Sequence, residues 1–374
     1  MKQENFDILV NRGGRAALPS RWGRKLIDPS TSMTRIAYFV HGRGKGHAIR
    51  TQAVMGGLRR SHDVRVFCAG EAWDVLKDVP GAEPALPCLP GKGMLRAFAL
   101  RFRGDRERLQ RWSPDLVVSD GDGPSVNAAK SLGIPVMAVG HGLILHHTHL
   151  NSALPFRQHA RELVNVASSS WPATRRVAVH FAPVRPRTPG TYVARPDLRS
   201  GIQRASRRED FLLAYFRDGN GLAPLERLVR RGHRVVLFGE PRKVPRGVEV
   251  HPSNVQAFAE ALGRCRAVVG SAGNHLPAEC AMLGIPMLAL HRGDDGEHQM
   301  NARLVEAAGI GIAADFGRCT PELIQRFEAE LDKPRDQLAA RTRAMRPASE
   351  VIPRAIDQLC RHRSERAAWK TRTA

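Results

Sequence analysis

Short apolar runs alternate with longer stretches of helical periodicity through the first half of the chain. The apolar runs are residues 35–40, 64–68, 115–119 and 134–139, and the helical stretches are residues 48–60 and 124–132. Alternation at this spacing predicts βαβ units, in which successive strands lie parallel in one sheet.

A cluster of prolines interrupts this pattern, which then begins again. Pro183, Pro186, Pro189 and Pro196 fall in one short stretch that is typical of an interdomain linker. The second set of strand-like runs comprises residues 211–216, 234–238, 267–270 and 286–290, with a helix expected over 222–231. The sequence therefore predicts an α/β protein with two doubly wound, Rossmann-like domains facing each other across a cleft. Ligands of such domains bind at the carboxyl ends of the strands.

These patterns divide the chain into five parts. Residues 1–33 are either a flexible tail or the product of an upstream start codon assigned in place of Met33. The other parts are a first Rossmann-like domain (34–185), a linker (186–209), a second Rossmann-like domain (210–345) and a basic C-terminal helix (346–374).

The composition is that of a globular protein, with 374 residues, of which 42% are apolar and 25% charged. No apolar run approaches the roughly 20 residues that span a bilayer, and the N-terminus lacks a signal-peptide pattern, so we expect a cytoplasmic protein. The six cysteines are scattered without a CxxC pair. We expect them to be reduced, with disulfides or zinc as the alternative.

The net charge of +22 changes this picture, because such a field attracts polyanions. Nucleic acid, an anionic membrane surface and small phosphate-bearing ligands all fit. The basic residues are spread over the whole chain, however, and no helix-turn-helix, zinc-finger or aromatic RNA-binding pattern accompanies them. We therefore expect no specific nucleic-acid partner.

The segment 268–286 has the pattern of a phosphate-binding turn. A strand ends in the small residues around Ser271, and a helix begins near Asn274 and His275. Backbone N–H groups at a helix start can hold a diphosphate, and Gly273 allows its close approach. Glu279 lies more than one turn into this helix, where a carboxylate can accept hydrogen bonds from both hydroxyls of a ribose.

A second glycine-rich loop follows the first strand of the chain. It runs from His41 to Arg50 and contains Gly44, Gly46 and, at the start of the next helix, His47. A neutral imidazole there can take a proton from a hydroxyl group, since its unperturbed pKa is near neutrality. Its partner is expected to be Asp120, which ends the strand at 115–119 and falls in the same row of loops. The alternatives are a helix cap or phosphate ligand for His47 and a turn former for Asp120.

Together these elements resemble the GT-B glycosyltransferases that carry a G-x5-E element followed by a D/E-Q-x-x-N-A element. These families include the UDP-glycosyltransferases and the family 28 transferase of lipid II synthesis. Residues 273–279 and 284–286 match in type and spacing, as do Glu297 and Asn301-Ala302. The sequence departs at His298, where these families usually carry Gln, and Gln299 follows one place later. The G-x-G-x-G-H-x-x-R opening is similar to a bacterial and archaeal branch.

The resemblance implies an inverting, metal-independent transferase that moves a sugar from a nucleotide-sugar donor, with UDP expected, to a hydroxyl acceptor. By the resemblance, His47 is the base and Asp120 orients it, the first domain binds the acceptor and the second binds the donor. Donor contacts are expected from Arg217, Gly219, Ser271, Gly273, Asn274, His275, Glu279, Glu297, His298 and Gln299. Phosphate or acceptor contacts in the first domain are expected from Gly44, Gly46, Arg50 and His141. The nucleotide sugar is a substrate, so no cofactor is expected.

Two further patterns raise the question of a metal. Asp120-Gly121-Asp122 spells the D-x-D of metal-dependent transferases of another fold, and His146-His147-Thr148-His149 groups three imidazoles. No carboxylate or cysteine adjoins the histidines in sequence, so an acceptor-facing loop with His141 at its base is the favoured interpretation. We expect no metal site.

Residues 94–112 form a basic amphipathic stretch. Leu95, Phe98, Ala99 and Phe102 are expected on one face and Arg96, Arg101, Arg103 and Arg106 on the other. Such a helix either packs its apolar face on the core or rests on an anionic membrane, which leaves a lipid-linked acceptor and peripheral membrane association open.

Two other functions fit parts of the sequence. A hydrolase of the same fold would use water in place of the acceptor, since residues 44–50 also resemble the opening of UDP-sugar hydrolases; nucleotide-sugar epimerases of this fold are a weaker alternative. A basic nucleic-acid-binding protein is the alternative of a different class.

Overall fold

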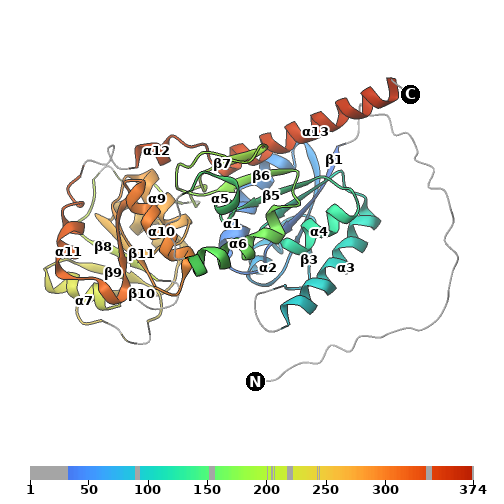
Figure 1. Ribbon diagram of the computed structural model, residues 1–374. Coiled ribbons are helices and arrows are strands. Elements are labelled where there is room, and N and C mark those ends of the chain that lie inside the picture. The colour runs from blue at the N-terminus through green and yellow to red at the C-terminus, as the bar shows by residue number, and fades with distance from the viewer. Residues whose placement is uncertain are drawn as a thin grey trace. The chain divides into compact units, whose positions relative to one another are not determined.

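The computed structural model describes residues 33–88, 93–150, 156–199, 201–203, 205, 207–216, 222–241, 243, 245–333 and 339–372 (Figure 1). Residues 34–374 form one compact unit. Two separate parallel sheets organise it, of seven and six strands. This arrangement confirms the prediction of an α/β protein with two doubly wound sheets.

The first sheet has the strand order β3-β2-β1-β4-β5-β6-β7, and every neighbouring pair is parallel. Its elements are β1 (Thr34–Val40), α1 (Lys45–Leu58), β2 (His62–Cys68), α2 (Gly70–Leu76), β3 (Ala82–Pro84), α3 (Met94–Trp112), β4 (Leu116–Asp120), α4 (Gly123–Ser131), β5 (Val136–Gly140), α5 (Leu143–His147), α6 (Phe156–Ser170), β6 (Arg175–Val179) and β7 (Thr191–Ala194). The central strands are buried along their whole length, as is usual when helices cover both faces.

The second sheet has the order β10-β9-β8-β11-β12-β13 and is also entirely parallel. Its elements are β8 (Leu212–Tyr215), α7 (Leu222–Arg230), β9 (Val235–Phe238), β10 (Glu249–His251), α8 (Val255–Arg264), β11 (Ala267–Ser271), α9 (His275–Leu283), β12 (Met287–His291), α10 (Gly296–Ala307), β13 (Gly311–Asp315), a 3₁₀ turn η1 (Phe316–Arg318) and α11 (Pro321–Glu328).

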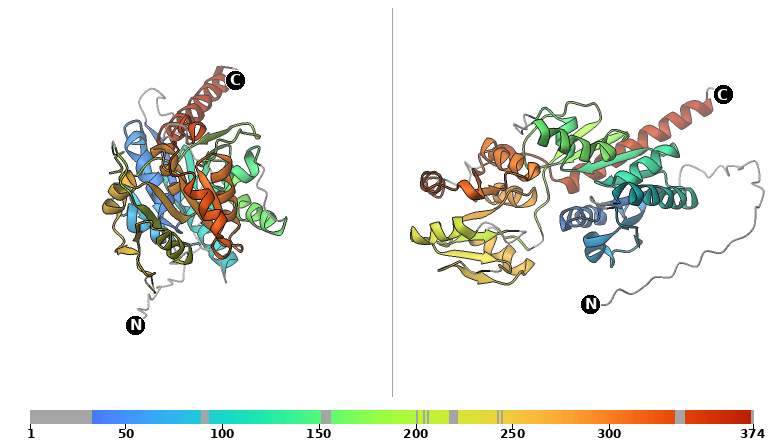
Figure 2. Two further views of the ribbon diagram at one scale, coloured as in Figure 1. Left: turned by 90° about the vertical axis from the view of Figure 1, so that its left-hand side faces the viewer. Right: turned by 60° about the horizontal axis from the view of Figure 1, so that its bottom comes forward.

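The end of the chain returns to the first sheet. After α12 (Ala340–Arg343), the long helix α13 (Ala348–Arg372) packs against α1, β6 and β7, and Figures 1 and 2 show it in red beside these strands. Its buried residues Ile352, Ala355 and Ile356 join the core that contains Ile36 and Val54. The predicted C-terminal helix is therefore present and contributes to the core of the first sheet.

Several strands were not predicted from the apolar pattern. They are β3, β6, β7, β10 and β13, which are short or carry polar residues. β3 has three residues, and β6 begins with Arg175 and Arg176. β7 lies inside the proline-rich stretch expected to be linker, yet it pairs with β6 along residues 191–194. β3, β7, β10 and β13 are edge strands, which need only one paired side, so their sequences carry a weak signal. β6 lies between β5 and β7, and its two arginines hide it from the apolar pattern.

The predicted helix over residues 94–112 forms, but the expected division into an apolar and a basic face holds only in part. Phe98 and Phe102 are half-buried, and Phe102 packs against the core. Leu95 is 82% exposed, whereas Arg101 is 1% exposed. The buried face consists of Arg101, Asp105, Leu109 and Trp112. Among the described residues, none of the helices is long and apolar enough to cross a membrane.

Arg101 is buried because two carboxylates and an aromatic ring surround it. Its Nε donates to Asp105 Oδ1 at 2.9 Å and its Nη2 donates to Asp122 Oδ2 at 3.1 Å. The guanidinium lies 5.8 Å from the centroid of Phe39. Burial raises the pKa of Asp105 to about 7 in spite of Arg101. Asp122 also caps α4 by accepting a hydrogen bond from Ser125 N, so this buried network joins α3 and α4 to the sheet.

We predict that Arg101→Met destabilises the protein by about 3–5 kcal/mol, because it removes the cation between two buried carboxylates and leaves Asp105 only the longer contact with Arg108. The free energy of unfolding, measured by urea denaturation, checks this. The control is Arg103→Met on the exposed side of the same helix, which should change stability by less than about 0.5 kcal/mol. Equal effects of the two substitutions would contradict the buried-network account.

Candidate active site

The candidate catalytic residues lie where the strand order of the first sheet reverses. β1 and β4 are neighbours, and the chain leaves them toward opposite edges of the sheet. Val40, the last residue of β1, pairs with Asp120, the last residue of β4. The backbone N–H of His41 donates to Asp120 O at 3.0 Å. Open α/β sheets bind ligands at such a switch point.

Three side chains meet at this point. His47 Nδ1 lies 2.6 Å from Asp120 Oδ1, and Arg50 Nε donates to Asp120 Oδ2 at 2.8 Å. Arg50 Nη2 also donates to Asp120 Oδ1. His47 and Arg50 are three residues apart in α1, so they share one face of the helix. The structure therefore brings together the predicted pair His47 and Asp120. It places Arg50 against Asp120 as a buried ion pair.

The charges around Asp120 define its ionisation. Burial alone would raise the pKa of Asp120, but Arg50 and His47 hold it well below its usual range. Burial lowers the pKa of His47, although Asp120 opposes this effect. At neutral pH the pair is therefore a carboxylate and a neutral imidazole. With its proton on Nδ1, His47 donates to Asp120 and keeps a lone pair on Nε2.

Glycine makes this close approach possible. Gly121 follows Asp120 with φ +71°, and a Cβ at this position would lie 2.8 Å from His47 Cε1. Gly44 precedes α1 with φ +80°. A side chain at residue 121 would therefore displace the imidazole.

The loop that carries His47 touches the start of α9 in the second sheet. A Cβ on Gly46 would lie 3.2 Å from His275 Cε1. His275 is the first residue of α9, directly after β11, and β11 and β8 form the switch point of the second sheet. Burial, with Arg50 and Arg199 nearby, lowers the pKa of His275 to about 3. The ring is therefore neutral at physiological pH.

The side chains at the start of α9 join the two sheets. Asn274 does not cap the helix. Its Nδ2 donates to Val179 O at 2.9 Å, and its Oδ1 accepts a hydrogen bond from Phe181 N at 3.3 Å. Asn301 of α10 accepts a hydrogen bond from His180 Nε2 at 3.0 Å. The backbone N–H groups of His275 and Leu276, in the first turn of α9, have no acceptor within the helix and suit an anion, whereas Gly273 N donates to Ser271 O and Pro277 has no N–H.

Glu279 has a partner that the sequence did not reveal. Its two carboxylate oxygens accept hydrogen bonds from Arg199 Nε at 2.6 Å and Nη2 at 2.8 Å. Burial raises the pKa of Glu279, although Arg199 opposes this. Arg199 belongs to the stretch expected to be linker, 80 residues away in sequence, and no motif there marks it.

The predicted donor-sugar loop forms the start of α10. Glu297 Oε1 lies 3.2 Å from His141 Nε2, at the end of β5 in the first sheet. Asp295 caps α10 by accepting a hydrogen bond from His298 N at 3.0 Å. Within the described part of the chain, Gln299 Oε1 is buried without a hydrogen-bond donor. The predicted contacts Arg217 and Gly219 lie outside the described residues.

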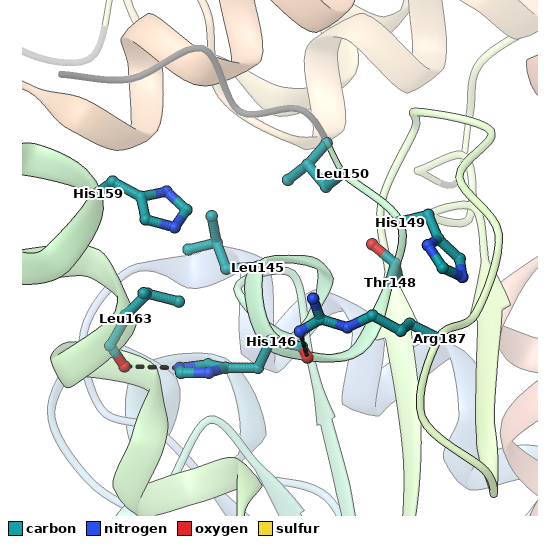
Figure 3. A pocket seen from close by; sticks show the side chains of 8 residues that line it. All are labelled: Leu145, His146, Thr148, His149, Leu150, His159, Leu163 and Arg187. Atoms are coloured by element: carbon teal, nitrogen blue, oxygen red, sulfur yellow. Dashed lines mark hydrogen bonds between the residues drawn. The ribbon is translucent and has the colours of Figure 1, made fainter. Parts of the chain in front are cut away.

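A cavity of about 680 Å³ opens beside the histidine-rich loop. Figure 3 shows its lining side chains, which are Leu145, His146, Thr148, His149, Leu150, His159, Leu163 and Arg187. His146 Nε2 lies 2.7 Å from Leu163 O, and His146 Nδ1 accepts a hydrogen bond from Trp171 Nε1. Over the residues that the structure describes, no group of three or more His, Cys, Asp or Glu side chains could hold a metal ion.

A sequence-family comparison matches more than half of the chain. The family model described as glycosyl transferase family 1 matches residues 99–332. No curated protein matches the sequence.

Solved structures match nearly the whole chain. Acinetobacter baumannii MurG is 17% identical, with a TM-score of 0.61, over 87% of this chain and 99% of its own. SnogD, a glycosyltransferase from Streptomyces nogalater, is 19% identical, with a TM-score of 0.62, over 88% and 99%. The Streptomyces sp. SF2575 glycosyltransferase SsfS6, complexed with thymidine diphosphate, is 19% identical, with a TM-score of 0.57, over 87% and 99%. At these identities the likeness shows the fold.

We predict that the ion pair of His141 and Glu297 stabilises the protein at mildly acidic pH. Glu297 raises the pKa of His141 in the folded protein. The stability that protonated His141 contributes is therefore fully present below pH 6.5, and it is lost as the pH rises through the raised pKa of His141. The charge of His141 lowers the pKa of Glu297 against the effect of burial, so the contribution of Glu297 is present above pH 4.5. The melting temperature of His141→Gln should fall furthest below that of the wild type between pH 4.5 and 6.5.

The control for this experiment is His251→Gln, which removes an exposed pair with Glu249. It should shift the melting temperature little at any pH, because exposed ion pairs are worth little. A deficit of His141→Gln that persists unchanged at alkaline pH would contradict the ion-pair account.

Proposed function

The chain belongs to the family described as glycosyl transferase family 1 and has the GT-B fold, and from this premise we propose that it transfers a sugar from a nucleotide-sugar donor to a hydroxyl acceptor with inversion. UDP is the proposed nucleotide. His47 is the proposed base and Asp120 the residue that orients it, and the reaction uses no metal ion. We propose that it takes place in the cytoplasm, in solution or at the inner face of the membrane.

One observation supports this proposal: the first turn of α1, which carries the proposed base, lies against the start of α9, where we propose that the diphosphate binds. Gly46, next to His47, approaches His275, the first residue of α9. A donor whose diphosphate lies at the start of α9 would therefore present its anomeric carbon near His47. The solved neighbour with bound thymidine diphosphate supports a nucleotide donor.

The chemistry follows from this placement. His47 Nε2 takes the proton of the acceptor hydroxyl as its oxygen bonds to the anomeric carbon. The bond from that carbon to the diphosphate breaks on the opposite face, which inverts the configuration. The N–H groups of α9 stabilise the charge on the departing nucleoside diphosphate. Asp120 stabilises the imidazolium that forms, and Arg50 keeps Asp120 ionised.

We propose the cavity beside α5 and α6 as part of the acceptor site. Leu145, Leu150 and Leu163 supply apolar lining, and Arg187 supplies positive charge among the polar lining residues. Met94 and Leu95 of α3 are exposed near basic residues. An acceptor with an apolar body and an anionic group suits these features, and a lipid-linked acceptor at a membrane surface is one such molecule.

We predict that one of UDP, dTDP, GDP and CMP raises the melting temperature clearly and that Glu279→Ala abolishes this shift. A ligand at 100 times its Kd adds about 2.7 kcal/mol of stability, which thermal unfolding detects. A short DNA duplex at two salt concentrations runs alongside. No shift with any nucleotide, together with a salt-sensitive shift with DNA, would contradict the transferase proposal and favour nucleic-acid binding.

We predict that His47→Gln lowers turnover by about 10²- to 10⁴-fold, because general-base catalysis contributes that much. Nucleotide release from UDP-glucose or UDP-N-acetylglucosamine is measured with and without a panel of alcohols and phenols. Because burial lowers the pKa of His47, the acidic limb of kcat/KM should lie below pH 6.5. Asp120→Asn should lower turnover and move this limb further to acid, since Asp120 raises the pKa of His47.

Two comparisons test the role of His47 separately from folding and binding. Nucleotide affinity should be the same in His47→Gln and the wild type, and His251→Gln, far along the chain on β10, should keep full turnover. Nucleotide release that needs no alcohol or phenol would favour a hydrolase. Full turnover by His47→Gln would rule out His47 as the base.

A further inference from the structure

Arg199 fills the position at Glu279 that the proposed function gives to the donor ribose. The carboxylate of Glu279 is 1% exposed, and both of its oxygens are bonded to the guanidinium of Arg199. The Arg199 side chain is 26% exposed, so it is the solvent-accessible member of the pair. A ligand that approaches Glu279 from this side meets Arg199 first.

The guanidinium is held on a second side by an aromatic ring. Its central carbon lies 4.9 Å from the centroid of Phe258, a buried residue of α8. Phe258 in turn contacts the ring of Tyr215, at the end of β8. Arg199 therefore bridges α8 and α9, the helices that precede and follow β11.

The two N–H groups of Arg199 and the two vicinal hydroxyls of a ribose are interchangeable donors for one carboxylate. Both present a pair of parallel hydrogen bonds to Oε1 and Oε2. Glu279 lies four residues after the first residue of α9, about 6 Å along the axis. A ribose bonded to Glu279 is thus within reach of a diphosphate at the helix start. Ribose and Arg199 cannot occupy these oxygens together.

We propose that Arg199 is a removable occupant of the ribose subsite, which a nucleoside diphosphate displaces when it binds. This inference rests on the proposed function, because it takes Glu279 as the ribose ligand. In the protein without a nucleotide, the Arg199 side chain occupies the ribose subsite. When a nucleotide binds, the two ribose hydroxyls replace the guanidinium as hydrogen-bond donors to Glu279. The same exchange in reverse releases the nucleoside diphosphate after transfer.

The backbone beside Arg199 is anchored, so the exchange involves its side chain. Arg195 N donates to Arg346 O and Ala348 N donates to Arg195 O, each at 2.9 Å, and Asp197 Oδ2 accepts a hydrogen bond from Ser349 N at 3.0 Å. These bonds tie the segment to the start of α13. The apparent affinity for the nucleotide is then the intrinsic affinity multiplied by the fraction of molecules in which Arg199 is displaced.

The test compares nucleotide binding by the wild type and Arg199→Met, which keeps an apolar stem over Phe258 and removes the two donors. Calorimetry with the tightest binder among UDP, dTDP, GDP and CMP should give a Kd at least about tenfold lower in Arg199→Met. Pyrophosphate lacks a ribose, so its affinity should stay equal or fall slightly.

The matched control is Arg234→Met. Arg234 pairs with Glu249 and lies 5.7 Å from the centroid of Phe211 in the same sheet, but its side chain is 60% exposed. The substitution removes the same charge and the same kinds of contact away from the site. Nucleotide affinity should stay at the wild-type value.

Arg199→Met leaves a buried carboxylate without its cation, so two further variants protect the test against misfolding. Arg199→Lys cannot make the paired hydrogen bonds and should bind nucleotide more tightly than the wild type. The double variant Arg199→Met/Glu279→Gln removes both charges and should bind more weakly than Arg199→Met.

The outcomes separate this inference from the proposed function. If the wild type binds a nucleotide and Arg199→Met or Arg199→Lys binds it equally or more weakly, Arg199 is a ligand or a bystander and the inference is wrong, while the proposed function stands. If neither the wild type nor these variants bind any nucleotide, the proposed function fails and the inference fails with it. Tighter nucleotide binding with unchanged pyrophosphate binding establishes the exchange.

Discussion

The site depends on one buried carboxylate, Asp120 at the end of β4. An ionised carboxylate without solvent is costly unless a cation and hydrogen bonds offset the loss of water. Arg50 supplies both, and because it lies one turn after His47 in α1, the same bonds fix the orientation of the helix and the imidazole. The backbone bond from His41 N to Asp120 O pins the intervening loop to the sheet. The bonds that hold α1 against the first sheet are therefore also the bonds that orient the candidate base.

Most of the fold and half of the site were predictable from sequence because they follow local rules. Apolar runs of strand length and their spacing predicted the central strands. His47 and Asp120 were paired because both fall in the same row of loops after strands and because the family resemblance implies the pair. The partner of Glu279 was not predictable: Arg199 comes from a stretch without periodicity, 80 residues away. The buried side of α3 was missed for the same reason, since Arg101 enters the core only through Asp105 and Asp122, and Asp122 lies beyond the helix.

Residues of the donor motif also join the two sheets. Asn274 and Asn301, which begin or lie in the helices after β11 and β12, bond to residues 179–181 at the end of β6. Thr342 Oγ1 donates to Phe181 O at 2.9 Å on the same short segment. Some polar side chains of the motif therefore hydrogen-bond to the first sheet's connecting segment and hold the two sheets together, so these atoms are already bonded within the protein. A motif match identifies positions, whereas the hydrogen bonds show which atoms are left for a substrate.

The acidic residues of the candidate donor site are already neutralised by groups from outside the motif. Arg199, from between the two sheets, pairs with Glu279, and His141, from the first sheet, pairs with Glu297. A donor that bonds to either carboxylate replaces its existing partner, Arg199 or His141. The affinity for the donor therefore reflects the bonds that form to the donor minus the bonds that are lost to that partner. A protein with a net charge of +22 can supply such internal partners readily. The basic excess that first indicated polyanion binding therefore also balances the carboxylates of its own site.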